Sequence, residues 1–279
     1  MSPKIMTLVV VAAVALVIAC GGSSSSPQGQ ADYLERSLKI LSDMNRDVLN
    51  ASSEPAILDR YLAASKEWAA LHPPQQLSST AKRFAAGLRT VSATPSQDSR
   101  TAVADQRRTN VLTLNVLRTI DGYNEWALAA TKYYSIVLLL EQSREMEPAF
   151  CQGDIVPFAK FGSGATSNSI GRWQLVLFTF PFDATRSSYK RVVGLPGETI
   201  EIRNGVIMIN GHEMANDYAK EKPTYSTAPL TIPSHSFYVL GDNWKSSPDS
   251  HLWATTNPGK ETVPEQNVLG VSSASAHGC

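Results

Sequence analysis

The sequence predicts an α+β protein in which an N-terminal helical segment is followed by a mostly β domain. Two observations carry this prediction. Between residues 31 and 131, apolar residues recur at steps of three and four, which is the period of an amphipathic helix. From residue 132 to residue 279, short runs rich in β-branched and aromatic residues alternate with turn residues, as in antiparallel strands joined by hairpins.

The helical segment divides into several helices at its turn residues. The Ser53-Glu54-Pro55 sequence predicts a helix start, because serine caps helix N-termini and proline is tolerated in the first turn. The expected helices cover residues 34–48, 54–71, 84–91 and 103–120, and the last is expected to end at Asp121-Gly122. Such a segment either docks a partner or serves as a spacer whose apolar stripes form its own small core, and we favour the spacer.

The second half contains the predicted strands. A continuous apolar run over residues 133–140 and another over 175–180 predict buried strands. The dipeptides Asn204-Gly205 and Asn210-Gly211 flank the run 206–209, so hairpins are expected on both sides of it. A further strand is expected over residues 237–240.

The composition excludes several classes of function. The 25 Lys and Arg residues balance the 25 Asp and Glu residues, so no nucleic-acid partner is expected. A hydrophobic fraction of 43% fits an ordinary globular core. No cofactor motif is present in the sequence, so no cofactor is expected. The five histidines lack the spacing of metal ligands, so no metal site is expected either. These histidines are His72, His212, His235, His251 and His277.

The first residues have the pattern of an export signal. Lys4 precedes an apolar run from Ile5 to Ala19 that only Thr7 interrupts. This length suits the apolar region of a secretory signal and is short for a membrane span. The sequence therefore predicts export.

The end of this run resembles the lipobox of bacterial lipoproteins. It reads Val-Ile-Ala-Cys over residues 17–20 and is followed by Gly and Ser. The resemblance implies that residues 1–19 are a lipoprotein signal peptide, that Cys20 is lipidated, and that residues 20–30 form a Gly/Ser tether. The protein would then be anchored to a bacterial membrane, inner or outer, and face the periplasm or the cell exterior. An uncleaved N-terminal anchor helix is the alternative.

Four segments of the second half, residues 143–148, 189–197, 241–253 and 263–270, together resemble the motifs of one enzyme family, the bacterial type I signal peptidases (serine peptidase family S26). Residues 143–148, Ser-Arg-Glu-Met-Glu-Pro, resemble the nucleophile segment, and residues 189–197, Tyr-Lys-Arg-Val-Val-Gly-Leu-Pro-Gly, resemble the segment of the catalytic lysine. Residues 241–253 resemble the late Gly-Asp-Asn motif, and residues 263–270 resemble the closing strand. The segments occur in the family's order, so the resemblance implies a signal peptidase I-like domain over residues 132–279.

The resemblance also implies a role for each site residue. Lys190 lies at the general-base position, Ser247 at the hydroxyl that orients the lysine, and Ser143 at the oxyanion position. The nucleophile position holds Glu145. Glutamate has no hydroxyl for an acyl-enzyme, and its carboxylate favours charged Lys190. We therefore expect an ion pair between Glu145 and Lys190, and no hydrolysis of signal peptides.

Other residues of the domain depart from the family's pattern. Glu141 lies where the family has an apolar residue beside its small-residue pocket, and His251 lies where the family has an arginine paired with the residue here numbered Asp249. We expect structural roles for Asp242, Asp249 and His251. If Cys20 is lipidated, Cys151 and Cys279 remain as a disulfide candidate, although the sequence does not show that they come close enough to bridge.

The expected function is therefore that of a lipid-anchored, catalytically inactive relative of signal peptidase I. It would bind extended or signal-peptide-like segments, or have a structural role in the cell envelope. The alternative is an active S26 serine-type endopeptidase that cleaves signal peptides, in which Lys190 works with a substitute nucleophile such as Ser143, or in which Glu145 activates water. A likeness in fold alone is a third possibility.

Overall fold

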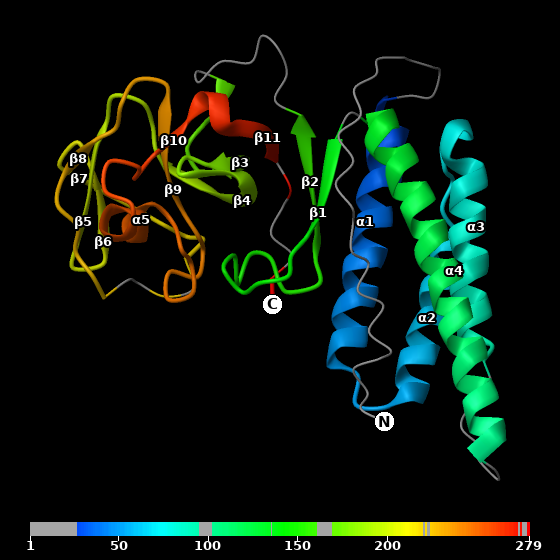
Figure 1. Cartoon of the computed structure of the whole chain (residues 1–279). Coiled ribbons are helices and arrows are strands. Elements are labelled where there is room, and N and C mark those ends of the chain that lie inside the picture. The colour runs from blue at the N-terminus through cyan, green and yellow to red at the C-terminus, as the bar shows by residue number, and fades with distance from the viewer. Residues whose placement is uncertain are drawn as a thin grey trace. The chain divides into compact units, whose positions relative to one another are not determined.

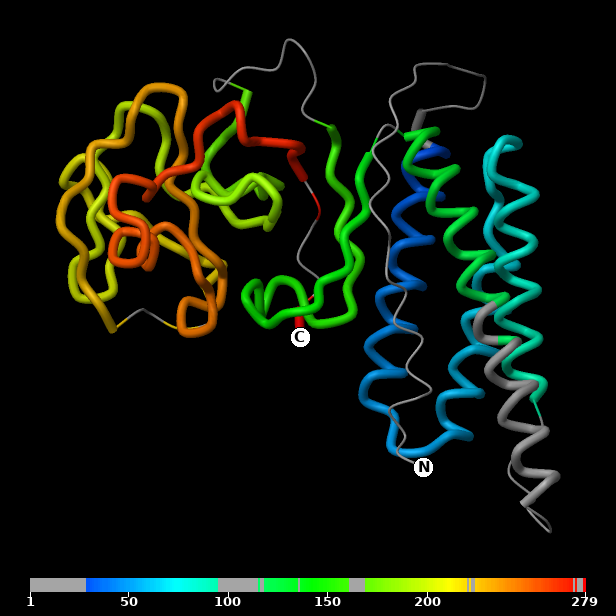
Figure 2. Tube along the Cα trace, viewed as in Figure 1, coloured from blue at the N-terminus to red at the C-terminus, as the bar shows by residue number. Residues whose placement is uncertain are grey.

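The computed structural model describes residues 27–94, 102–134, 136–160, 169–219, 221, 224–272, 274 and 278–279 (Figures 1 and 2). The chain separates into two compact units. Unit 1 holds the chain up to Leu140 together with Gly153–Val156, and unit 2 holds Glu141–Gln152 and Pro157–Cys279. The predicted signal peptide and Cys20 lie outside the described residues.

Unit 1 contains the helices of the predicted helical segment. They are α1 (Pro27–Asn50), α2 (Glu54–Ala69), α3 (Gln75–Ser92) and α4 (Ala102–Tyr134), and strand β1 (Ile136–Leu140) follows (Figure 1). The predicted start of α2 is confirmed, because Ser53 is its N-cap and accepts a hydrogen bond from the N–H of Ala56. None of the described helices combines the length and apolar character that crossing a membrane requires.

The structure corrects several predicted boundaries in this unit. The third helix, expected from residue 84, begins at Gln75. Helix α1 begins at Pro27, inside the predicted tether, because proline is readily accommodated in a first helical turn. Helix α4 continues through Gly122 to Tyr134. The helix end predicted at Asp121-Gly122 is therefore wrong, and the strand predicted from Tyr133 begins only at Ile136.

Gly122 serves helix packing and does not end the helix. A Cβ atom placed on Gly122 would lie 3.3 Å from the Cα of Phe84 in α3. In the same way, a Cβ on Gly87 of α3 would lie 3.0 Å from the Oγ1 and 3.1 Å from the Cα of Thr119 in α4. The two glycines let the backbones of α3 and α4 approach closely, which outweighs their low helix propensity.

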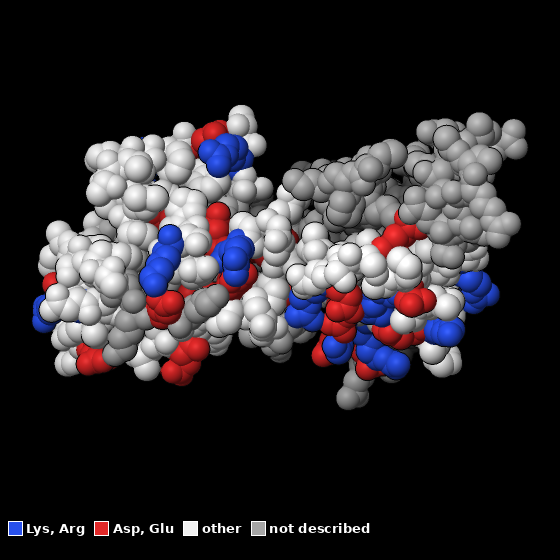
Figure 3. Space-filling model, turned by 90° about the horizontal axis from the view of Figure 1, so that it is seen from below, with Lys and Arg blue, Asp and Glu red and all other residues white. Residues whose placement is uncertain are grey.

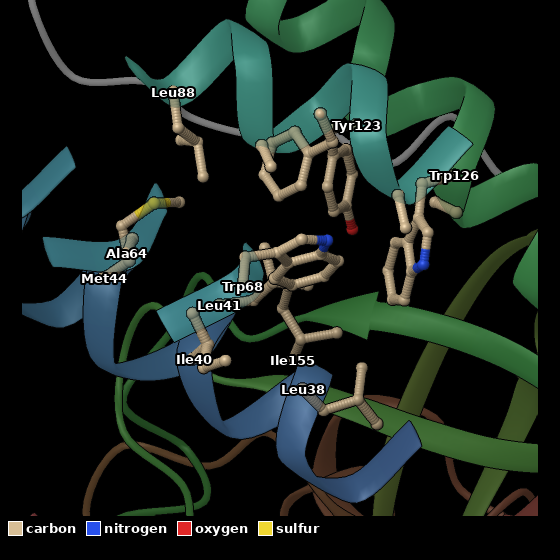
Figure 4. Close-up of a cluster of buried hydrophobic side chains, with 14 of the residues drawn as sticks. Leu38, Ile40, Leu41, Met44, Ala64, Trp68, Leu88, Tyr123, Trp126 and Ile155 are labelled. Atoms are coloured by element: carbon tan, nitrogen blue, oxygen red, sulfur yellow. The ribbon is translucent and has the colours of Figure 1, made fainter. Parts of the chain in front are cut away.

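The apolar stripes of the helices meet in a common core (Figure 4). Trp68 of α2 packs edge-on against Phe84 at 4.9 Å between ring centroids, and edge-on against Trp126 of α4 at 5.0 Å. The Nε1 of Trp126 donates a hydrogen bond to the Oη of Tyr33 in α1, 3.0 Å away. Helices α1 to α4 therefore contribute to one hydrophobic core within unit 1.

Unit 2 contains antiparallel strands, as predicted. In its larger sheet, neighbouring strands follow the order β2 (Ile155–Lys160, whose first residues belong to unit 1), β11 (Val268–Ser272), β3 (Leu175–Phe180), β4 (Asp183–Gly194), β9 (Ser236–Leu240) and β10 (Val263–Pro264). The smaller sheet has the order β7 (His212–Met214), β6 (Val206–Ile209), β5 (Thr199–Arg203) and β8 (Leu230–Thr231). Helix α5 (Ser250–Thr256) and the 3₁₀ turn η3 (Glu265–Asn267) lie between the last strands of the sequence.

The two Asn-Gly hairpins are confirmed. Asn204 and Gly205 have φ angles of 49° and 80°, and Asn210 and Gly211 have 50° and 81°. Positive φ at both central residues is the mark of the tight turn that joins twisted strands, and asparagine and glycine tolerate it best. These turns join β5 to β6 and β6 to β7.

Strand β4 lies between β3 and β9 and carries the predicted lysine. Lys190 lies opposite Val176 of β3, and Arg191 lies opposite Leu240 of β9. The residues of β4 from Tyr189 to Gly194 are buried. The sheet thus places Lys190 in the interior of unit 2.

A disulfide bridge joins Cys151 to Cys279 within unit 2, the pairing that the sequence left open. The N–H of Cys279 also donates a hydrogen bond to the carbonyl of Pro148 at 3.1 Å. The last residue is therefore attached to the segment that follows Glu145.

Charged side chains of both signs are interspersed on the face drawn in Figure 3. Ion pairs such as Arg60–Glu67 and Arg83–Glu125 connect neighbouring charges, with N–O distances of 2.9 and 2.6 Å. This arrangement agrees with the balanced composition of the chain.

We expect Trp68→Ala to lower the free energy of unfolding of unit 1 by about 3–5 kcal/mol, because it leaves a cavity between α2, α3 and α4. Urea denaturation of the full chain, followed by far-UV circular dichroism, measures this change. Leu128→Ala is the matched control, since Leu128 lies on α4 with 51% of its surface exposed. Equal losses in the two variants would contradict the assignment of the core.

Candidate active site

Lys190 is the central residue of the candidate site. Its side chain is almost fully buried, and its Nζ donates hydrogen bonds to Oε2 of Glu145, to the Oγ of Ser188 at 3.2 Å and to the carbonyl of Tyr189 at 3.2 Å. A charged lysine has three N–H donors. All three therefore have an acceptor within unit 2.

Glu145 lies on the irregular segment that precedes β2. The side chain of Glu145 is 23% exposed, and its carboxylate forms an ion pair with Lys190. The N–H of Asn243 donates to the carbonyl of Glu145 at 2.9 Å, and the side-chain amide of Asn243 donates to the carbonyl of Arg144 at 2.9 Å. The loop after β9 thus holds the segment in place, and the structure brings together the two residues that the sequence analysis expected to pair.

Ser143 lies two residues before Glu145, and its hydrogen bonds are directed at Glu141. Both the N–H and the Oγ of Ser143 donate to Oε1 of Glu141, each at 2.7 Å. The Oγ of Ser143 also accepts the N–H of Glu145 at 3.2 Å. The other oxygen of Glu141 accepts a hydrogen bond from the hydroxyl of Tyr189. The sequence indicates a charge at position 141, but no pattern in it predicts these hydrogen bonds between Glu141, Ser143 and Tyr189.

The predicted contact between Ser247 and Lys190 is not formed. The Oγ of Ser247 is buried and has no hydrogen-bond partner among the described residues. The three N–H donors of Lys190 bind elsewhere, and Ser188 supplies the hydroxyl contact in place of Ser247. Ser188 and Lys190 are alternate residues of β4 and so face the same side of the sheet, which is the sequence feature that could have identified Ser188.

Gly241 nevertheless allows Ser247 to lie close to the backbone of Glu145. A Cβ atom placed on Gly241 would lie 2.3 Å from the Oγ of Ser247 and 2.6 Å from the carbonyl oxygen of Glu145. No side chain larger than hydrogen fits between these atoms without a shift of the backbone. The motif therefore brings Ser247 beside the backbone of Glu145 without bonding it to the lysine.

Asp242 has the structural role that was expected. Its carboxylate accepts hydrogen bonds from Nε and Nη2 of Arg191 at 2.8 and 2.6 Å, and both side chains are buried. Burial raises the pKa of the Asp242 carboxyl, and Arg191 opposes this effect. Arg191 also donates to the carbonyl of Trp173 and lies 3.7 Å above the ring centroid of Tyr218. This cluster attaches β4 to the loop after β9.

Asp249 and His251 also have structural roles. Asp249 is the N-cap of α5 and is fully buried, and it accepts hydrogen bonds from the N–H of His251 and the N–H of Gly241. A ring nitrogen of His251 contacts the same carboxylate, so His251 takes the place beside Asp249 that the resemblance assigns to arginine. The ring of Tyr225 stacks on His251 with 4.1 Å between centroids. No group of residues in the described part of the chain is placed to hold a metal ion.

Comparisons with known proteins point to one family. The family model described as signal peptidase, peptidase S26, matches residues 126–276. Signal peptidase I of Leptolyngbya laminosa is 43% identical over 81 residues, which cover 29% of this chain and 36% of that protein. Probable signal peptidase I-1 of Synechocystis sp. is 30% identical over 135 residues, which cover 46% of this chain and 64% of that protein. The chain thus spans less than two thirds of the length of either relative.

A solved structure gives a further comparison. The crystal structure of a signal peptidase I from Enterococcus faecalis V583 is 29% identical with a TM-score of 0.31, and the match covers 37% of this chain and 95% of that one. The family match includes the candidate site and extends over more than half of the chain. It confirms the resemblance carried by the site motifs, and the chain belongs to the signal peptidase family, peptidase S26.

Proposed function

We propose that this member of the family does not hydrolyse signal peptides, because Glu145 occupies the position of the nucleophilic serine. The observation that carries the proposal is the ion pair between the Glu145 carboxylate and the buried Lys190 amine. What remains for the domain is to bind extended, signal-peptide-like segments or to have a structural role in the cell envelope.

The chemistry of the pair supports this proposal. A lysine acts as a general base only when it is neutral, and an adjacent carboxylate stabilises the charged form. With its three N–H groups donated to acceptors, the ammonium of Lys190 has no lone pair with which to remove a proton. Glu145 also lacks the hydroxyl proton that would be removed.

An active endopeptidase is the alternative, and it requires a substitute nucleophile. The Oγ of Ser188 accepts a hydrogen bond from the ammonium of Lys190, and in this arrangement Lys190 offers no lone pair that could remove the hydroxyl proton of Ser188. The Oγ of Ser143 donates to Glu141 and is not among the hydrogen-bond acceptors of Lys190. Either serine would act only after Lys190 lost its proton and its bond to Glu145.

We expect no turnover of a synthetic peptide that spans a signal-peptide cleavage site by the unmodified full chain. Mass spectrometry of the products, with an active type I signal peptidase assayed in parallel, measures this. The Glu145→Ser variant replaces the carboxylate by a hydroxyl and should give detectable cleavage at the same bond. Turnover by the unmodified chain would contradict the proposal, and Ser143→Ala and Ser188→Ala would then identify which hydroxyl is the nucleophile.

We expect Glu145→Gln to lower the free energy of unfolding by on the order of 1–3 kcal/mol, because it leaves the charge of Lys190 buried without its anion. The value is below that of a fully buried pair, because Glu145 is 23% exposed. The double variant Glu145→Gln with Lys190→Met should recover most of the loss, and a double-mutant cycle from urea denaturation measures the coupling. Glu201→Gln is the control and should have a much smaller effect, because the cation that it leaves without a partner, Arg203, is 58% exposed. Strictly additive effects of the two site substitutions would argue against a structural ion pair.

We also propose that Cys20 is lipidated and anchors the protein to a bacterial membrane, a proposal that rests on residues 17–22 alone. In an expressing bacterium, the protein should incorporate radiolabelled palmitate and sediment with membranes. Cys20→Ala should abolish the label, and Ser25→Ala, in the predicted tether, should not. An unlabelled protein that stays with the membrane whether or not Cys20 is present would instead indicate an uncleaved anchor helix.

A further inference from the structure

Glu141 has a buried carboxylate, and the groups that donate hydrogen bonds to it are all uncharged. It is 4% exposed, and its oxygens accept the N–H of Ser143, the hydroxyl of Ser143 and the hydroxyl of Tyr189. Among the described residues, no cation lies within ion-pair distance of it. The hydroxyl of Ser143 donates to one carboxylate oxygen and the hydroxyl of Tyr189 donates to the other.

The consequence for Ser143 is specific. A serine hydroxyl has a single proton and therefore donates one hydrogen bond at a time. In this structure the Oγ of Ser143 makes that donation to Oε1 of Glu141, 2.7 Å away. A lone pair of the same Oγ accepts the N–H of Glu145, which further fixes the orientation of the hydroxyl.

We infer that Glu141 is a positioning residue that withholds the hydroxyl of Ser143 from the oxyanion site. The inference rests on the proposed function, in which Ser143 occupies the oxyanion position. An oxyanion is stabilised by donors that already point at it, so a hydroxyl that donates to a carboxylate contributes nothing. The site is therefore held inactive twice, by Glu145 at the nucleophile position and by Glu141 at the oxyanion donor.

Tyr189, on strand β4, supports the hydrogen bond between Glu141 and Ser143. It precedes Lys190 on β4, and its hydroxyl binds the oxygen of Glu141 that Ser143 leaves free. Its ring packs edge-on against Phe158 at 5.2 Å between centroids, and the side chain is buried. Because the tyrosine is fixed by this packing, it holds the carboxylate toward Ser143.

The test compares two variants of the full chain that both carry Glu145→Ser. The substrate is the synthetic peptide that spans a signal-peptide cleavage site. Adding Glu141→Leu should raise kcat by about 10²–10³-fold with little change in KM, which is the usual effect of one oxyanion donor. Glu141→Gln is the matched control, because its amide oxygen still accepts both bonds from Ser143, and it should give no such gain.

Ser143→Ala separates this role from a purely structural one. It should lower kcat by about 10²-fold or more in the background that carries Glu141→Leu, where the hydroxyl is free to donate. In the background that keeps Glu141, it should change kcat little, because the hydroxyl is already engaged. Equal kcat with and without Glu141→Leu would overturn the inference alone, whereas turnover by the unmodified chain would contradict the proposed function.

Crystal structures of the two variants decide the case even if neither cleaves the peptide. With Glu141 present, the Oγ of Ser143 should remain within hydrogen-bond distance of the carboxylate. With Glu141→Leu, it should turn toward residue 145, and Tyr189→Phe can be added if the unpaired phenol prevents folding. A Ser143 hydroxyl that points away from Glu141 in the Glu145→Ser variant would overturn the inference.

Discussion

A positive charge in the interior of unit 2 is the constraint on which the candidate site depends. Lys190 lies on a strand with neighbours on both sides and is almost fully buried. An isolated ammonium in such a place is strongly unfavourable, so it must lose its proton or find an anion. The chain supplies the anion through Glu145, whose carboxylate forms an ion pair with the ammonium of Lys190.

The same principle extends along β4. Three consecutive residues of the strand, Tyr189, Lys190 and Arg191, each bind a different acid. The partners of these three residues are Glu141, Glu145 and Asp242, respectively: the first two lie on the segment before β2, and the third lies on the loop after β9. Since neighbouring side chains of a strand point to opposite faces, these contacts attach both faces of β4 to the segments that surround it. Strand β4 is thereby fixed by polar contacts as well as by its sheet.

Local patterns predicted much of the fold, and they failed where tertiary contacts decide. Ser53 and the Asn-Gly pairs act on their own backbone, so the start of α2 and the two hairpins followed from the sequence. Asp121-Gly122 predicted a helix end because glycine has a low helix propensity. The actual role of Gly122 is to let α3 pack closely against α4, and no local sequence pattern reveals such a contact. In the site, the pairing of Glu145 with Lys190 followed from aligned motifs. The sequence did not show that the ammonium of Lys190 would bind the hydroxyl of Ser188 and not that of Ser247, because this depends on which acceptors lie near it in the folded chain.

The bridge between Cys151 and Cys279 encloses the sheets of unit 2 in a covalent ring, because every residue from 151 to 279 lies between its two ends. A protease that cuts one peptide bond within this ring opens it without releasing a fragment. The two pieces stay joined through the sulfur atoms, close to the segment that carries Glu145. A nicked molecule would therefore gain only the mass of one water until the bridge is reduced, and only then separate into two chains.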